Sequence, residues 1–133
     1  MSDEKNQECI KTAENATVKV ALRSILGTTI EVPGVTRGDN FVDILRKCIE
    51  ADKTGESENF FDGKDSFETF KAGGKGINFD NSSITLLDNS EALMTMEILK
   101  PIGEQIPKEF DKAVSTNGTL TFLVNMAMTV GSE

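Results

Sequence analysis

The chain has 133 residues, of which 27% are charged and 38% hydrophobic, and it carries a formal net charge of −8. That balance is ordinary for one globular domain, but it argues against a nucleic-acid groove or an anionic membrane surface, because phosphate groups are bound by clustered Lys and Arg. No apolar run approaches the roughly 18 residues that a membrane-spanning helix needs. The N-terminal residues also lack the basic and apolar regions of a signal peptide.

Residues 1–15 are polar and contain four acids and two lysines, which predicts a flexible acidic tail ahead of a single α+β domain over residues 16–133. The first strand pair of that domain is predicted from alternation, since residues 17–23 are apolar at every second position. Pairing Leu22 with Ile30 leaves a three-residue loop, Ile25-Leu26-Gly27, with glycine at the left-handed position of such loops.

One main helix and one short helix follow. Pro33-Gly34 is expected to end the second strand, and residues 40–52 then carry apolar side chains at helical spacing behind a capping Asn40. A second helix is predicted over 107–115, with proline at its first position. The main helix is expected to cover one face of the sheet.

A second hairpin is predicted over Ser83–Leu99. Residues that face each other across an antiparallel pair share a face of the sheet, so the alternation asks for a loop with an odd number of residues, Asn89-Ser90-Glu91. The expected pairs are Ile84 with Met96, Leu86 with Met94, and Thr85 with Thr95.

The last segment, residues 119–130, predicts one long strand, because every even-numbered residue in it is apolar. A helix would leave Phe122 and Met126 off its apolar stripe. The whole pattern indicates an α+β fold with a mostly antiparallel sheet built from hairpins. The opening hairpin followed by a helix resembles the start of a β-grasp domain, in element order only.

The most acidic stretch, residues 50–68, contains seven acids against two lysines. Asp62 and Asp65 are weak candidates for oxygen ligands of Ca²⁺ or Mg²⁺, but the spacing of an EF-hand is absent and Lys64 interrupts the acids. A solvated loop is the favoured interpretation. After it, Ser66–Lys71 and Lys75–Phe79 predict two weak strands.

Catalytic chemistry has little support in the composition. The chain contains no histidine, which is the commonest general base and metal ligand in proteins. Cys48 therefore has no histidine to activate it, and its place on an apolar helical stripe predicts a buried side chain. Two cysteines, Cys9 and Cys48, make no disulfide framework, so we expect a reducing, cytoplasmic setting. We predict no catalytic residue and no cofactor.

Protein contacts are the favoured function. Two large apolar residues at a loop tip, the odd-numbered face of residues 119–130, and the phenylalanines of the acidic loop are the expected contact surfaces. The residues concerned are Ile25, Leu26, Phe60, Phe61, Leu123 and Asn125.

Three functional classes stay open from the residues alone. The first is a non-enzymatic protein–protein interaction or assembly module that forms a homo-oligomer, including an accessory component of a larger complex such as a viral particle. The second is an acidic regulator or inhibitor that presents loop 50–68 to a basic partner. The third, with least support, is an enzyme that uses carboxylates or a divalent metal. Neither nucleic acid nor a membrane is an expected partner.

Overall fold

The fold is that of a computed structural model, which describes residues 16–73, 77–89, 91–127 and 129–130. The predicted tail lies outside these ranges. The strands are β1 (Thr17–Arg23), β2 (Thr29–Thr36), β3 (Ile77–Asn78), β4 (Ser83–Asp88), β5 (Glu91–Thr95), β6 (Thr119–Asn125) and β7 (Thr129–Val130). The helices are α2 (Phe41–Ala51), α3 (Lys64–Ala72), α4 (Ile102–Gln105) and α5 (Pro107–Thr116), with a 3-10 helix η1 (Glu56–Phe60).

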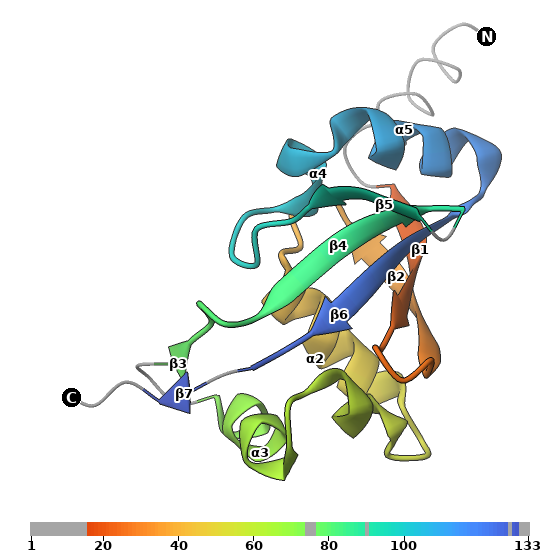
Figure 1. The fold of residues 1–133 in the computed structure, drawn as a ribbon. Coiled ribbons are helices and arrows are strands. Elements are labelled where there is room, and N and C mark those ends of the chain that lie inside the picture. The colour runs from red at the N-terminus through yellow and green to blue at the C-terminus, as the bar shows by residue number, and fades with distance from the viewer. Residues whose placement is uncertain (1–15, 74–76, 90, 128, 131–133) are drawn as a thin grey trace, which may run out of the picture.

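Five strands form one sheet in the order β2-β1-β6-β4-β5 (Figure 1). β1 and β6 run parallel at the centre of the sheet, and the other neighbours are antiparallel. The predicted α+β class, with a mostly antiparallel sheet, is therefore confirmed. The first and the last long strand, β1 and β6, are thus neighbours in the sheet.

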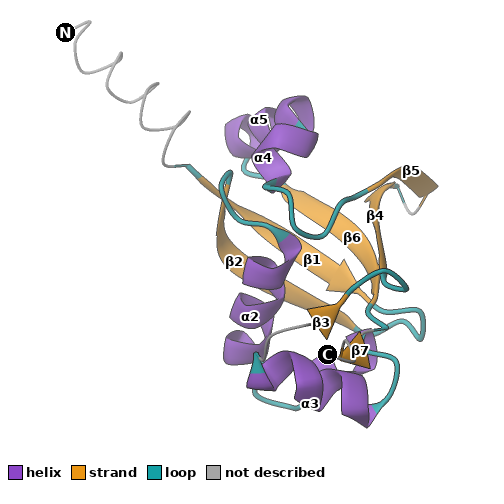
Figure 2. Ribbon diagram, turned by 90° about the vertical axis from the view of Figure 1, so that its left-hand side faces the viewer, coloured by secondary structure: helices purple, strands orange, loops and turns teal. Residues whose placement is uncertain are grey.

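The sheet has one covered face. Its even-numbered apolar side chains on β1, β4 and β6 are buried in a single core, and α2, α4 and α5 lie on this side (Figure 2). Phe41 of α2 meets Phe122 of β6 edge to face, with ring centroids 4.9 Å apart. Edge-to-face contact is a preferred geometry for aromatic pairs, so this contact ties the main helix to the central strand.

The first hairpin has the predicted register and loop. Leu22 pairs with Ile30, and Gly27 takes the left-handed conformation, with φ of 99°. The expectation that Pro33-Gly34 ends the second strand is wrong, because β2 continues to Thr36. The register shifts between the pairs that flank Pro33-Gly34. β2 lies at the edge of the sheet. Proline, which has no backbone N–H, is tolerated on an edge strand at positions where an N–H would point away from the sheet.

The second hairpin has the predicted pairs but not the predicted loop. Thr85 pairs with Thr95 and Leu86 with Met94. Asp88 pairs with Glu91, however, so only two residues connect the strands, and a register shift after Leu86 absorbs the extra residue. Either a bulge or a longer loop keeps the even-numbered apolar residues of both strands on the same face of the sheet.

The main helix occupies Phe41–Ala51 behind Asn40, whose side chain accepts from the Asp43 N–H at 2.9 Å in a capping box. The short helix predicted over 107–115 is α5, whereas α4 was not predicted. The expectation of a strand over Ser66–Lys71 is wrong, because this segment lies in α3. Phe67 and Phe70, three residues apart, are both buried, and that spacing belongs to a helix face.

The run 119–130 is not one unbroken strand. β6 ends at Asn125, which pairs with Ser83, the first residue of β4. The chain then turns to another segment, where the Met126 N–H donates to the Phe60 carbonyl at 2.8 Å. β7 pairs with β3 in a separate two-stranded sheet. The backbone of Met126 lies beyond the end of the β4–β6 pairing, and its N–H finds an acceptor elsewhere in the same chain, as buried backbone polar groups require.

Candidate interaction surface

The second face of the sheet has no helix over it among the described elements (Figures 1 and 2). We call this the open face; it carries the odd-numbered side chains of β1, β4 and β6. Thr121, Leu123 and Asn125 of β6 are all partly exposed there, and the small Ala21 is its buried member on β1. The predicted contact residues Leu123 and Asn125 therefore do lie on an accessible surface.

The predicted apolar loop tip is also accessible. Ile25 is 65% and Leu26 is 84% exposed. The turn beneath them is well bonded: the Ser24 N–H donates to the Thr28 carbonyl at 2.8 Å, and the Thr28 N–H donates to the buried Ser24 hydroxyl at 3.0 Å. Two large apolar side chains are thus held in solvent by an ordered turn.

The loop tip adjoins the open face. Arg23, the last residue of β1, pairs with Leu123, and the 25–27 loop starts two residues further along the chain. On its other side, the Asn59 amide donates to the Thr28 hydroxyl at 2.9 Å, which braces the loop against η1. The structure therefore brings Ile25, Leu26 and Leu123 to the same end of the sheet.

Phe60 and Phe61 do not belong to this surface, which corrects the expectation that they contact a partner. Phe60 is fully buried and Phe61 is 6% exposed. The Phe61 ring lies 5.3 Å from the rings of both Phe67 and Phe70. In the sequence these phenylalanines lie among acids, but the acids point outward while the rings pack inward.

The acidic stretch presents its carboxylates to solvent, and Asp62 and Asp65 are both exposed. Across the described ranges, no group of three or more acidic, cysteine or histidine side chains is placed to hold a metal ion. Asp52 is bonded instead to its own loop, where it accepts from the Ser57 N–H at 2.8 Å and the Thr54 N–H at 3.0 Å. Burial opposes ionisation of this carboxyl, but the bonds from Ser57 and Thr54 bring its pKa below the ordinary value.

Cys48 lies in the core, as its place on the helical stripe predicts. Burial raises the pKa of its thiol to about 12, and the nearby Asp52 carboxylate adds to the shift. The thiolate is the reactive form of cysteine, so this thiol is held in an unreactive state at neutral pH.

One exposed region was not predicted, the edge strand β5. All five of its residues are exposed, including Leu93 at 50% and Met94 at 39%. Alternation assigned Met94 to the same buried layer as Met96, which is indeed buried. No local pattern shows that β5 is the outermost strand, so the exposure of Met94 follows from strand order alone.

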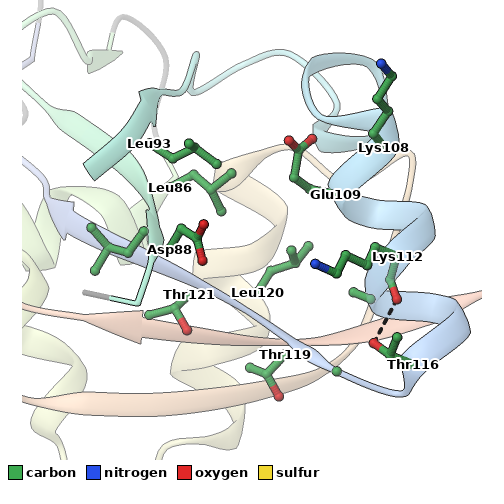
Figure 3. A pocket seen from close by; sticks show the side chains of 13 residues that line it. Leu86, Asp88, Leu93, Lys108, Glu109, Lys112, Thr116, Thr119, Leu120 and Thr121 are labelled. Atoms are coloured by element: carbon green, nitrogen blue, oxygen red, sulfur yellow. Dashed lines mark hydrogen bonds between the residues drawn. The ribbon is translucent and has the colours of Figure 1, made fainter. Parts of the chain in front are cut away.

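A cleft of about 340 Å³ lies between α5 and the β4–β5 hairpin. Figure 3 shows Leu86 and Leu93 on the hairpin side, Lys112 and Glu109 on α5, and Leu120 at the base. The cleft combines apolar side chains with charges of both signs. Sequence reasoning missed it because its walls come from three separate segments.

The chain matches no protein-family model, no curated protein and no solved structure. Within the part of the chain that the structure describes, no helix is long and apolar enough to cross a membrane.

Proposed function

We propose that the protein is a non-enzymatic interaction module that associates with a second copy of itself through the open face and the Ile25-Leu26 tip. The observation that carries the proposal is the 84% exposure of Leu26 on a hydrogen-bonded turn. Burying a leucine side chain contributes roughly 1.5–3 kcal/mol. Leaving two such side chains in water at the border of an uncovered sheet is typical of a contact surface.

The size of the open face supports this proposal. Five strands about 4.8 Å apart, with up to eight residues at about 3.3 Å each, give a face of roughly 20 by 25 Å. That area is about 500 Å², so with the loop tip added the surface fits a small, weak interface, which buries less than about 1,200 Å² in total. Self-contact through this face also leaves the β5 edge free for other components, as in a subunit of a larger assembly.

The charge of the open face supports the proposal as well. Lys19 and Arg23 on β1 share the open face with Glu31, the partner of Ala21 on β2. The face is therefore not acidic, although the chain carries a net charge of −8. Two copies can meet here without bringing their acidic stretches together, and an antiparallel approach can place Glu31 near Arg23.

The test is sedimentation velocity over a range of concentrations for the wild type, Leu26→Asp and Leu99→Asp. Leu99 is a matched control, because it is 64% exposed but lies outside the open face and the tip. We expect the wild type and Leu99→Asp to dimerise with rising concentration, and Leu26→Asp to need at least tenfold more protein. A monomeric wild type throughout, or equal effects of the two substitutions, would contradict the proposal.

A second candidate is an acidic regulator that presents stretch 50–68 to a basic surface. The supporting observation is that Glu56, Glu58, Asp62 and Asp65 are exposed while the neighbouring phenylalanines are buried. Binding of this kind weakens steeply as salt rises, because surface charges are screened. Association that is insensitive to salt between 50 mM and 500 mM would favour the open face instead.

A further inference from the structure

The cleft between α5 and the β4–β5 hairpin exists because the strands around it have different lengths. The pairing of β4 with β6 ends at Leu87 and Thr121, whereas β6 begins at Thr119. The hairpin turns away at Asp88, and α5 packs into the core through Phe110 and Ala113 without closing the gap. The resulting volume, about 340 Å³, lies at the small end of the range for ligand sites, roughly 300–1,000 Å³.

The inner lining of the cleft is aliphatic. Leu86 and Leu120 are buried members of the core that form its base, and Ala113 of α5 lies beside them. Leu93 stands over the cleft from β5 (Figure 3) and is half exposed. An aliphatic group placed between Leu93 and this base would remove apolar surface from water on both sides.

The lining of the cleft carries charges of both signs. Lys108, Glu109 and Lys112 lie on the α5 side, and Asp88 lies on the opposite wall. Figure 3 shows the Lys112 side chain extending toward Leu120, whereas Lys108 points away from the cleft. The ion pairs between described residues are Arg37–Asp111, Lys47–Asp39 and Lys71–Glu68, so Lys112 and Asp88 face each other across the cleft without pairing.

We infer that this cleft binds a small zwitterion with an aliphatic side chain, namely a free aliphatic amino acid. Its carboxylate would pair with Lys112, its ammonium group with Asp88, and its side chain would pack between Leu93 and Leu120. Lys112 points into the cleft and Asp88 faces it from the opposite wall, so a ligand with only one charge would leave one of these two side chains without a partner. Charge complementarity therefore selects a ligand that carries both charges.

The site lies at the opposite end of the sheet from the Ile25-Leu26 tip, although Leu87, Thr119 and Thr121 of the open face also line it. Arg23 and Leu123, next to the tip, pair at one end of the β1–β6 ladder, and Thr119 lies at the other end. A binding experiment can therefore be carried out on Leu26→Asp as well as on the wild type, so that failure of one proposal does not decide the other.

The experiment uses L-leucine as the probe and follows the leucine methyl signals of the intact chain by NMR. We expect saturable shifts at Leu86, Leu93 and Leu120, with weak affinity of order millimolar because the cleft is open on one side. Glycine, which lacks the aliphatic group, should bind at least tenfold more weakly. So should 4-methylpentanoate and 3-methylbutylamine, each of which carries a single charge.

Matched variants test the two charged contacts. Lys112→Gln and Asp88→Asn should each weaken L-leucine binding at least tenfold, while Lys64→Gln, an exposed lysine outside the cleft, should leave it unchanged. Unchanged methyl spectra of the free variants will show that they are folded. Absence of saturable shifts at tens of millimolar L-leucine, or equal binding of the singly charged analogues, would overturn the inference.

Discussion

The two faces of the five-stranded sheet follow the same alternation but have opposite surroundings. Phe122 and Leu123 are neighbours on β6, yet Phe122 is fully buried against Phe41, while Leu123 remains partly exposed with no described helix above it. Both residues are large and apolar. Burial in this protein therefore depends on which face the helices cover, and less on the hydrophobicity of the side chain itself.

Truncation of this neighbouring pair gives the largest expected contrast. Phe122→Ala should lower the free energy of unfolding by about 3–5 kcal/mol, because it removes a buried aromatic side chain and leaves a cavity. Leu123→Ala should cost less than about 1 kcal/mol, since its side chain is already partly in water. Urea denaturation of the two variants measures both values. Similar losses would show that the open face is also covered.

The turn at the end of the open face should be more sensitive to backbone strain than to lost contacts. Gly27 has φ of 99° and would have no atom within 4 Å of an added Cβ, so Gly27→Ala should cost about 1–2 kcal/mol through strain alone. Gly38 has equal space and no positive φ, which makes Gly38→Ala a matched control. Thermal unfolding should show a lower midpoint for Gly27→Ala only.

The Asp52 carboxylate stabilises the loop that follows α2, because it accepts hydrogen bonds from Thr54 and Ser57. Asp52→Ala should cost roughly 1 kcal/mol near pH 7, the usual net value of such hydrogen bonds. Because the folded pKa is lowered, this contribution is present above the pKa of the unfolded chain and is lost as pH falls through the folded value. The difference in the free energy of unfolding between wild type and variant should therefore shrink as pH is lowered from 7 to 2. A constant difference in stability at all pH values would contradict this role.

The smallest effect on stability is expected at the loop tip. Leu26→Asp replaces a side chain that is 84% exposed, so the free energy of unfolding should change by less than about 0.5 kcal/mol. Urea denaturation at low protein concentration, where the chain is monomeric, measures this value. A loss above 2 kcal/mol would mean that Leu26 packs within the fold and is not available for contact.

Alternation along the chain was sufficient to predict both long hairpins and the buried layer on β1, β4 and β6. Helical spacing behind Asn40 predicted α2 within one residue of its observed ends. These features depend on residues close together in sequence, where side-chain period and capping chemistry act directly.

The order of the strands in the sheet, and which sheet face the helices cover, could not be predicted in this way. The parallel contact of β1 with β6, the edge position of β5, and the turn of Met126 toward Phe60 all join distant segments. Consequently the exposure of Ile25 and Leu26 could be predicted from the sequence of their own loop. The exposure of Leu93 and the burial of Phe60 could not be predicted, because both depend on distant segments. The cleft beside α5 was missed for the same reason.

The most direct test of the account is a concentration series of amide NMR spectra of the wild-type chain. If the open face is the contact surface, signals of residues 21–26 and 121–125 will shift as protein concentration rises, and those of α2 will stay in place. Shifts confined to α2 or to residues 50–68, or no shifts at any concentration, would contradict the account.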